Sequence, residues 1–559
     1  MDAAQPARLS KQLSAANKIM PREDLKIVVI GGVAAGASCA ARARRLSEKV
    51  SITIVERGPD VSFANCGLPY HIGGEIVSRD VLSIHTPQSL SAMLGLEVRT
   101  NTEAVEIDRD AKRVRVRKTG TEEGEWLSYD KLLLAPGASP LCPPLPGIDD
   151  PRIHTLRNLQ DMDAIKAAAA KARKAVVVGA GFIGLEMAEQ FRHLGLDVSL
   201  VELQPQLLPQ LDADMTGQLL RELKQNGVDV HLGSGIEGFA SAGDSLQCRL
   251  SGGVSIEADI VVLSIGVRPD SSLAAAAGLT LGKRGHIVVN EFMQTSDPDI
   301  YAAGDAVESF DRITGKPSAV PLGGPANRQG RLAACHMMDP ESARPYPGSI
   351  GTAVVRAFGV TCAMTGWSEK RLKSEAIAYK AVTVKDNHHA SYYPGATPIT
   401  LRVIWEEGTG RILGAQASGQ EGVDKRIDVI ATAIAAGMCI EDLSNLELCY
   451  APPFGSAKDV VNLAGLAAEN LMDGLLTQVN ELPKDALAQV IDVRPAKLFQ
   501  SAPRPNATSI PMDCLRARMG ELDKSRPVVT VCALGKTSYF AARVLNQNGF
   551  SAKSLAAGV

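Results

Sequence analysis

The chain has 559 residues, which is too long for one hydrophobic core and, at about 100 to 200 residues per domain, gives about three to five domains. Its net charge of −3 argues against a nucleic-acid partner. The longest apolar run, Val429 to Ile440, is shorter than the roughly 20 residues that span a bilayer, so we expect a packed helix there and no membrane contact.

Residues 1–24 mix polar and apolar side chains without the apolar stretch of a secretion signal, and we treat them as an extension that precedes the first domain. Ten cysteines are scattered along the chain with no CxxC and no Cys/His spacing that would predict a metal site. This usage favours reduced thiols and a cytoplasmic location.

Residues 25–56 predict a βαβ unit with a dinucleotide fingerprint. An apolar strand leads into Gly31, which allows a tight turn, and Gly36 lets the following helix approach the strand. Glu56 ends the second strand, where a carboxylate binds ribose hydroxyls. Val33 stands at the usual second glycine of the fingerprint.

A second βαβ unit begins at residue 174, and its glycines Gly179, Gly181 and Gly184 match all three fingerprint positions. Glu202 ends its second strand. Because a carboxylate binds a ribose 2′-hydroxyl and repels a 2′-phosphate, NADH is favoured over NADPH. Two such units in one chain suggest two cofactors that exchange electrons.

The segment TSDPDIYAAGDAVE, residues 295–308, places a short strand, Ile300 to Ala302, before Gly304 and Asp305. It resembles the flavin-binding signature of the pyridine nucleotide-disulfide oxidoreductases, and YDKLLLAPGASP, which contains Ala135, resembles a segment flanking the NADH domain in that family. The resemblance implies FAD as the first cofactor, with Asp305 binding its ribityl chain.

Cys66 lies in SFANCGLPY and has no second cysteine in the CxxxxC spacing usual for this large family. The stretch resembles the coenzyme A-disulfide reductase branch, as do PLGGPANRQGR and YAPPFGSAKD further on. A single thiolate attacks a sulfur–sulfur bond, keeps one half as a mixed disulfide, and needs electrons to be reset. A cysteine that begins a helical turn suits this role, since the helix N-terminus favours the thiolate.

The same resemblance implies a set of coenzyme A contacts: Ser38, Arg42, Arg45, Ser62, Asn65 and Lys458. It also implies that Tyr450 and either Tyr392 or Tyr393 enter the partner subunit's active site as proton donors. The site would then need a homodimer, and the sequence spacing leaves the choice between Tyr392 and Tyr393 open.

The end of the chain resembles a rhodanese domain. Cys532 directly follows a predicted strand and precedes a helix, and a loop from Cys532 to Thr537 would aim backbone N–H groups at a persulfide. Asp492 and Arg494 match the family's DVR strand end. The chain departs from that family in lacking its usual histidine and glycine in PRPNATSIP and in having Lys536 as the loop's single cation.

We therefore predict an α/β protein with two Rossmann-type dinucleotide-binding domains, an α+β dimerisation domain and a C-terminal α/β rhodanese-like domain. The expected boundaries are an extension at 1–24, an FAD-binding domain at 25–150 and 270–340, an NADH-binding domain at 151–269, a dimerisation domain at 341–475, a linker at 476–484 and a rhodanese-like domain at 485–559.

The predicted function is a flavin-dependent reductase that uses NADH to reduce coenzyme A persulfide, polysulfide or coenzyme A disulfide through Cys66, releasing sulfide or thiol. One alternative is an NADH oxidase or peroxidase that uses a cysteine sulfenate. Another is a sulfur-carrier or redox-sensing protein in which turnover is incidental. The sequence leaves open whether coenzyme A is a substrate or a bound cofactor.

Overall fold

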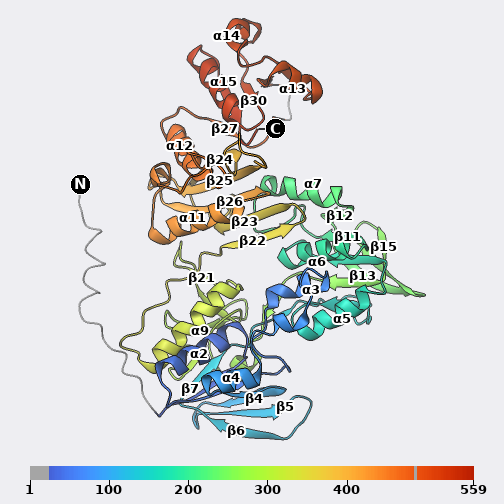
Figure 1. Ribbon diagram of the computed structural model, residues 1–559, viewed down its shortest axis with the longest axis vertical. Helices are drawn as coiled ribbons and strands as arrows, with labels where there is room; N and C mark the ends of the chain where they lie inside the picture. Colours follow the sequence, from blue (N-terminus) through green and yellow to red (C-terminus); the bar gives the residue numbers. More distant parts are fainter. Residues whose placement is uncertain (1–23, 484–486, 559) are drawn as a thin grey trace. The chain divides into compact units, whose positions relative to one another are not determined.

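The computed structural model describes residues 24–483 and 487–558, and these form two compact units (Figure 1). The first unit comprises residues 24–144, 151–171 and 263–349, and the second comprises residues 145–150, 172–262, 350–483 and 487–558. Residues 1–23 of the predicted extension at 1–24 lie outside the described residues, as do residue 484 of the predicted linker and residues 485, 486 and 559 of the predicted rhodanese-like domain.

The first unit is built on a parallel sheet whose strands lie in the order β19-β7-β1-β2-β3. Its strands are β1 (Lys26–Ile30), β2 (Ser51–Val55), β3 (Glu97–Arg99), β7 (Lys131–Leu134) and β19 (Ile300–Ala302). Strand β1 reads KIVVI and is buried from its second residue on, as a central parallel strand must be. Further elements of the unit are the antiparallel strands β4 (Thr102–Asp108), β5 (Arg113–Lys118) and β6 (Gly124–Ser128) and the helices α3 (Leu68–Ile72), α4 (Pro87–Leu94) and α5 (Leu159–Ala169).

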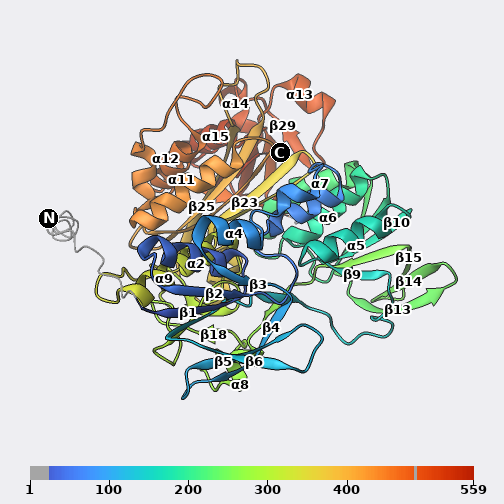
Figure 2. The ribbon, with the colours of Figure 1, turned by 60° about the horizontal axis from the view of Figure 1, so that its bottom comes forward.

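Helices α2 (Ala34–Leu46) and α9 (Gly323–Met338) pack against each other beside this sheet (Figure 2). Their backbones come so close that a Cβ on Gly330 would lie 2.0 Å from the Ala35 carbonyl oxygen. Only glycine fits at such a crossing. The close approach brings α9, which follows the predicted flavin signature, onto the helix of the first fingerprint.

The second unit repeats the dinucleotide fold with strands in the order β12-β11-β10-β16, of which β10, β11 and β12 are parallel. The elements are β10 (Lys174–Val178), β11 (Asp197–Glu202), β12 (Val228–Leu232), β16 (Ile260–Leu263), α6 (Phe182–His193) and α7 (Gly217–Gln225). A meander of β13 (Ile236–Ala242), β14 (Ser245–Leu250) and β15 (Ser255–Ala258) extends from it.

An antiparallel sheet follows in the order β22-β23-β26-β25-β24. It contains β22 (Ala353–Ala357), β23 (Val360–Gly366), β24 (Tyr379–Asn387), β25 (Pro398–Glu406) and β26 (Ile412–Gly419), with α11 (Val423–Ala436) and α12 (Val460–Met472) packed on it. The β25–β26 hairpin turns through Gly408 at a φ of 90°, and α11 is the helix expected from the apolar run near Val429.

A last parallel sheet has the order β27-β31-β30-β28-β29. Its elements are β27 (Gln478–Val479), β28 (Gln489–Asp492), β29 (Ala507–Ser509), β30 (Val528–Val531), β31 (Ala552–Leu555), α13 (Ala496–Ser501), α14 (Leu515–Arg518) and α15 (Lys536–Gln547). Strand β27 lies within the segment that the sequence assigns to a linker. It belongs to this sheet because it pairs with β31. The mixed α/β class predicted from sequence is confirmed.

Buried polar contacts join the dinucleotide fold of the second unit to its antiparallel sheet. Arg402 of β25, only 2% exposed, donates from Nη1 to Asp214 at 2.9 Å and faces Asp212 at 3.4 Å and Glu369 at 3.1 Å. Removing Arg402 would leave buried carboxylates without their cation and lower the free energy of unfolding by about 3–5 kcal/mol.

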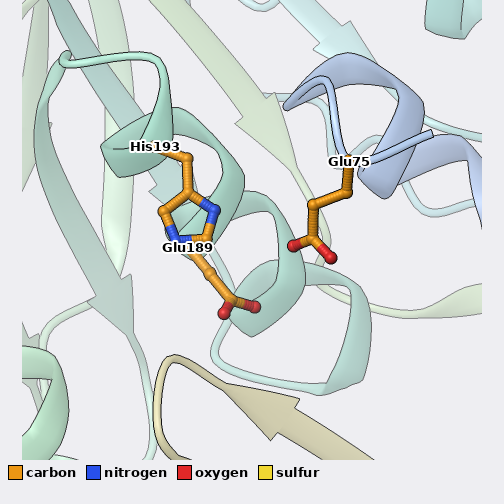
Figure 3. A group of neighbouring side chains, drawn as sticks. All are labelled: Glu75, Glu189 and His193. Atoms are coloured by element: carbon orange, nitrogen blue, oxygen red, sulfur yellow. The ribbon is translucent and has the colours of Figure 1, made fainter. Parts of the chain in front are cut away.

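A second contact joins α6 to the antiparallel sheet. Glu189 and His193 lie one turn apart on α6 (Figure 3), and Glu189 accepts from the Phe358 N–H at 2.8 Å.

In the part of the chain that the structure describes, no helix is both long and apolar enough to cross a membrane.

Candidate active site

The first glycine-rich turn is fixed by backbone crowding and by one carboxylate. Gly31 has a φ of 94°, and a Cβ there would lie 2.1 Å from the Ala135 carbonyl oxygen. A Cβ on Gly36 would lie 1.8 Å from the Gly31 carbonyl oxygen. Glu56 accepts from the N–H groups of Gly32 and Gly58, each at 2.9 Å, so its carboxylate braces the turn from the end of β2.

The second turn repeats this arrangement. Gly179 has a φ of 102°, and Glu202 accepts from the N–H of Ala180 at 2.8 Å and of Gln204 at 2.7 Å. Gly184 is buried in the first turn of α6. Gly181 differs, because a Cβ there would meet nothing within 4 Å. Open space beside the N-terminus of α6 is what a pyrophosphate needs at this position.

Asp305 follows β19, where the flavin signature places it. Gly304 takes a φ of 86°, and its N–H donates to Gln329 of α9 at 2.8 Å, which fixes the chain direction before Asp305. Burial raises the pKa of the Asp305 carboxyl, and the positive charge of Arg157 opposes that rise. A half-buried carboxyl at the end of this strand is suited to accept hydrogen bonds from a polyol chain.

These residues fit FAD at the first fold. The crowded glycines admit the backbone close to a pyrophosphate, Glu56 keeps lone pairs for ribose hydroxyls, and Asp305 would supply a half-buried acceptor.

Cys66 begins a helical turn, as predicted. It lies in a 3₁₀ turn, Asn65–Gly67, that continues directly into α3, and both Asn65 and Cys66 are exposed. The preceding Ser62 has a left-handed φ of 52°, and its carbonyl accepts from the N–H groups of Ile84 and His85. The sulfur is therefore presented on a short loop held at both sides by backbone hydrogen bonds.

Two residues that the sequence does not single out hold the helix after Cys66. The Lys166 ammonium donates to His71 at Nε2 and at the carbonyl oxygen, each at 3.0 Å, while His71 Nδ1 lies 2.7 Å from the Ile76 carbonyl. Because Lys166 donates to Nε2, the ring donates from Nδ1 to Ile76. The lysine of α5 thus fastens α3 and the cysteine turn to the rest of the unit.

The proposed coenzyme A contacts on α2 face α9. Ser38 donates to Asn327 at 2.6 Å, and the Arg42 Nε lies 3.2 Å from the Cys335 sulfur, while Arg45 is exposed. The arginine between them, Arg44, is 6% exposed and donates to four backbone carbonyls, so it is a structural residue. Arg42 and Arg45 therefore remain the two arginines of this turn with accessible guanidinium groups.

The structure distinguishes Tyr392 from Tyr393 by their contacts. The hydroxyls of Tyr392 and Tyr450 lie 3.0 Å apart, although 58 residues separate them in sequence. Both side chains are exposed, and the hydrogen bond between Tyr392 and Tyr450 raises the pKa of Tyr392. Tyr393 instead packs edge-on against His389, with ring centroids 5.5 Å apart. Lys458 is exposed on the loop that carries Tyr450.

Cys532 is buried, and two backbone N–H groups donate to its sulfur. These are the N–H groups of Gly535 and Ser538, both at 3.2 Å, while the thiol itself donates to the Ser538 hydroxyl oxygen at 3.4 Å. Helix α15 begins at Lys536, so the loop is shorter than the predicted span to Thr537. Asp492 and Arg494 pair with each other at 2.6 Å beside the strand that leads to this loop.

A nucleotide fold with an exposed cysteine turn, a second nucleotide fold, and a tail with a buried cysteine that accepts two backbone N–H groups define a two-cofactor sulfur oxidoreductase. The chain belongs to the pyridine nucleotide-disulfide oxidoreductase family, which residues 25–328 match. Residues 352–460 match the dimerisation domain of that family and residues 475–559 match a rhodanese-like domain. The protein is accordingly an FAD- and NAD-dependent oxidoreductase.

Relatives cover nearly the whole chain. The coenzyme A disulfide reductase of Staphylococcus aureus (strain JH9) is 36% identical over 446 residues, which are 79% of this chain and all of that protein. The reduced CoADR-RHD of Bacillus anthracis is 43% identical with a TM-score of 0.91, covering 96% of this chain and 97% of that one. The NAD-dependent persulfide reductase of A. fulgidus is 38% identical with a TM-score of 0.91, covering 96% and 99%.

Proposed function

We propose that the protein uses NADH to reduce a sulfane or disulfide sulfur bound to coenzyme A, through Cys66, and that its rhodanese-like tail handles sulfane sulfur on Cys532. The observation that carries the proposal is the pair of sulfur centres: an exposed thiol on a helical turn and a buried thiol that receives two backbone N–H groups. The names of the related proteins, a coenzyme A disulfide reductase and a persulfide reductase, support the substrate class.

Cys66 acts as the nucleophile in this proposal. Its thiolate attacks the sulfur–sulfur bond of the substrate, a new bond forms to Cys66, and the other half leaves as a thiolate or as sulfide. FAD, when bound, supplies the electron pair from NADH that returns Cys66 to the thiolate. Ser62 and Asn65 flank the cysteine and orient the substrate, while Arg42 and Arg45 bind its phosphate groups.

Tyr392 and Tyr450 are the proposed proton donors for the leaving thiolate. Their mutual hydrogen bond favours Tyr392 over Tyr393, because a shared proton between two phenols positions both hydroxyls together. Both residues, with Lys458, would serve the partner subunit in a homodimer, which the dimerisation domain supports. A cytoplasmic location is part of the proposal, since none of the ten cysteines forms a disulfide.

Glu202 supports NADH as the electron donor, because its carboxylate lies at the end of β11, where a 2′-phosphate would be repelled.

The test is steady-state NADH oxidation by FAD-loaded protein with coenzyme A persulfide, coenzyme A disulfide, oxygen or peroxide, with sulfide assayed in parallel. We expect kcat/KM for the persulfide to exceed the others by tenfold or more, which is about 1.4 kcal/mol of transition-state preference. Faster turnover of peroxide, with a sulfenate on Cys66 that dimedone traps, would instead identify a peroxidase.

A further inference from the structure

We propose that Arg426, through its buried ion pair with Asp459, is a positioning residue for the tyrosine pair of the site. The inference rests on the proposed role of Tyr392 and Tyr450 as proton donors and adds the residue that holds their hydroxyls together. All four residues belong to the second compact unit.

The two tyrosines lie on separate loops and are fixed by little packing of their own. Tyr392 lies on the first tyrosine loop, residues 388–397, between β24 and β25, and Tyr450 lies on the second tyrosine loop, residues 446–459, which ends at α12. Tyr392 is 74% exposed and Tyr450 is 48% exposed. A hydrogen bond between two exposed hydroxyls contributes little free energy. Their 3.0 Å separation therefore depends on what holds the two loops.

Arg426 of α11 bonds to both loops. Its Nη2 donates to the His388 carbonyl at 2.6 Å and to the Asp459 carboxylate at 2.7 Å, and its Nε donates to the same carboxylate at 3.2 Å. His388 is the first residue of the first tyrosine loop, and Asp459 is the last residue of the second. Because Arg426 and Asp459 are both buried, one guanidinium joins the two loops away from water.

Two further contacts hold the same loops. The Asn462 side chain of α12 donates to the carbonyls of Leu443 at 3.0 Å and Leu446 at 2.9 Å, where the chain enters the second tyrosine loop. The Ala390 N–H donates to the Gly455 carbonyl at 2.9 Å, so the loops also meet through their backbones. The second tyrosine loop is thus held at its start, near its middle and at its end.

The ion pair is explained better by geometry than by stability. Burying two charges costs about as much as their attraction contributes, and an apolar pair of similar volume is often as stable. The guanidinium, however, bonds in several directions at once, which an apolar side chain cannot do. Gly422 at the start of α11 leaves room for it: Gly422 has a φ of 68°, and a Cβ there would lie 2.4 Å from the Arg426 Nη1.

Loss of this bridge should separate the two hydroxyls and change the titration of Tyr392. The hydrogen bond with Tyr450 raises the pKa of Tyr392, and Tyr450 is also the nearby group whose charge acts on it. A chain without the bridge should therefore have a Tyr392 pKa closer to that of an isolated tyrosine. The variants below leave the other titratable side chains of the loops unchanged, among them His388, His389, Tyr393, Glu447, Cys449 and Lys458.

The experiment measures the Tyr392 pKa in the FAD-loaded full chain from tyrosinate absorbance, as the difference between each chain and the same chain carrying Tyr392→Phe. Arg426→Lys keeps a cation beside Asp459 but lacks the planar fork. Gly422→Ala keeps every charge, while its Cβ displaces the guanidinium. We expect both variants to lower the Tyr392 pKa as Tyr450→Phe does. Their kcat with coenzyme A disulfide should fall about tenfold, and KM should change less than about threefold.

The control is Arg402→Lys, which changes a second buried arginine of the same unit. Arg402 donates to Asp214 at 2.9 Å and to Thr383 at 3.0 Å, and neither partner lies on a tyrosine loop. This variant should lower the melting temperature and leave the Tyr392 pKa in place.

A Tyr392 pKa that stays at the wild-type value in both Arg426→Lys and Gly422→Ala would overturn the positioning role, and so would an equal shift in Arg402→Lys. A chain that prefers peroxide to every sulfur substrate, but whose Tyr392 pKa falls in both bridge variants, would refute the proposed function and leave the positioning role standing.

Discussion

The two sulfur centres of the chain are built in opposite ways. Cys66 is exposed on a 3₁₀ turn in a loop that backbone hydrogen bonds hold at its flanks, whereas Cys532 is buried and its sulfur receives N–H groups from Gly535 and Ser538. An exposed thiol can meet a large substrate and a cofactor at once. A buried sulfur that accepts two N–H groups can hold a small anionic sulfur against hydrolysis and exchange. If the proposed roles hold, this difference in burial and in hydrogen bonding would separate reduction at Cys66 from sulfur storage at Cys532.

The largest expected effect separates the two centres directly. Cys66→Ser should lower NADH-dependent reduction of coenzyme A disulfide by on the order of a thousandfold or more, since the nucleophile is lost. Cys532→Ser should leave that reaction within about twofold and abolish persulfide on the tail. Steady-state kinetics and mass spectrometry measure the two outcomes, and a Cys532→Ser chain that fails to reduce the disulfide would show that the centres are not separate.

The tyrosine pair should matter only to the exposed centre. Tyr450→Phe should reduce turnover at Cys66 by about a hundredfold, as for the loss of a general acid. In Tyr393→Phe, the matched control, turnover should stay near wild type because that ring packs on His389. Loss of activity in the Tyr393 variant, with Tyr450→Phe active, would reverse the assignment.

The same pair predicts a pH effect. The hydrogen bond that the Tyr392 phenol donates to Tyr450 raises the pKa of Tyr392, so this phenol keeps its proton to a higher pH than an isolated tyrosine. Removing that bond in Tyr450→Phe lowers the pKa, and the alkaline limb of the residual kcat/KM profile should move to lower pH. A limb that stays in place, or moves upward, would mean that Tyr392 is not the titrating donor.

The buried centre should respond to its loop geometry. Gly535 has a φ of 87°, and a Cβ there would lie 3.3 Å from the Ala557 N atom. Gly535→Ala therefore strains the loop by about 1–2 kcal/mol and moves an N–H away from the sulfur, which should slow Cys532 persulfide formation about tenfold. Turnover at Cys66 should not change, and a parallel loss there would indicate general unfolding.

The smallest effect is expected for Ser538→Ala. The variant keeps the backbone N–H on the sulfur and loses only the hydroxyl, whose oxygen accepts from the Cys532 thiol at 3.4 Å and whose proton is donated to the Gly535 carbonyl at 2.8 Å. Persulfide formation should fall about threefold, in line with a single neutral hydrogen bond. A loss as large as that of Gly535→Ala would mean that the hydroxyl, and not the backbone, holds the sulfur.

Local patterns made much of the fold and part of the site predictable. The strand Ile300–Ala302, the two glycine turns and the helical start at Cys66 follow from short-range spacing, and the structure contains each of them. The pairing of Tyr392 with Tyr450 could not be predicted from short-range spacing, because the two residues meet through the packing of separate loops. The predicted linker at 476–484 contains β27, since an isolated pair of residues signals no strand until its partner β31 is known.

Long-range placement also explains what the sequence analysis missed. Lys166 sits in an ordinary helix, and its role depends on His71, which tertiary structure brings close. The role of Arg44 could not be predicted either. Three arginines lie within four residues of α2, and only the fold shows that Arg44 donates to backbone carbonyls.

The carboxylate of Glu202 has a consequence for redesign of the enzyme. Its two oxygens already accept from the N–H groups of Ala180 and Gln204, so the side chain that would choose the nicotinamide cofactor also holds the turn together. Replacing it with a cation to accept a 2′-phosphate would unpair two backbone donors at the same moment. Cofactor preference and turn stability therefore depend on the same side chain. A variant enzyme that uses NADPH needs a new acceptor for the Ala180 and Gln204 N–H groups as well as a cation for the 2′-phosphate.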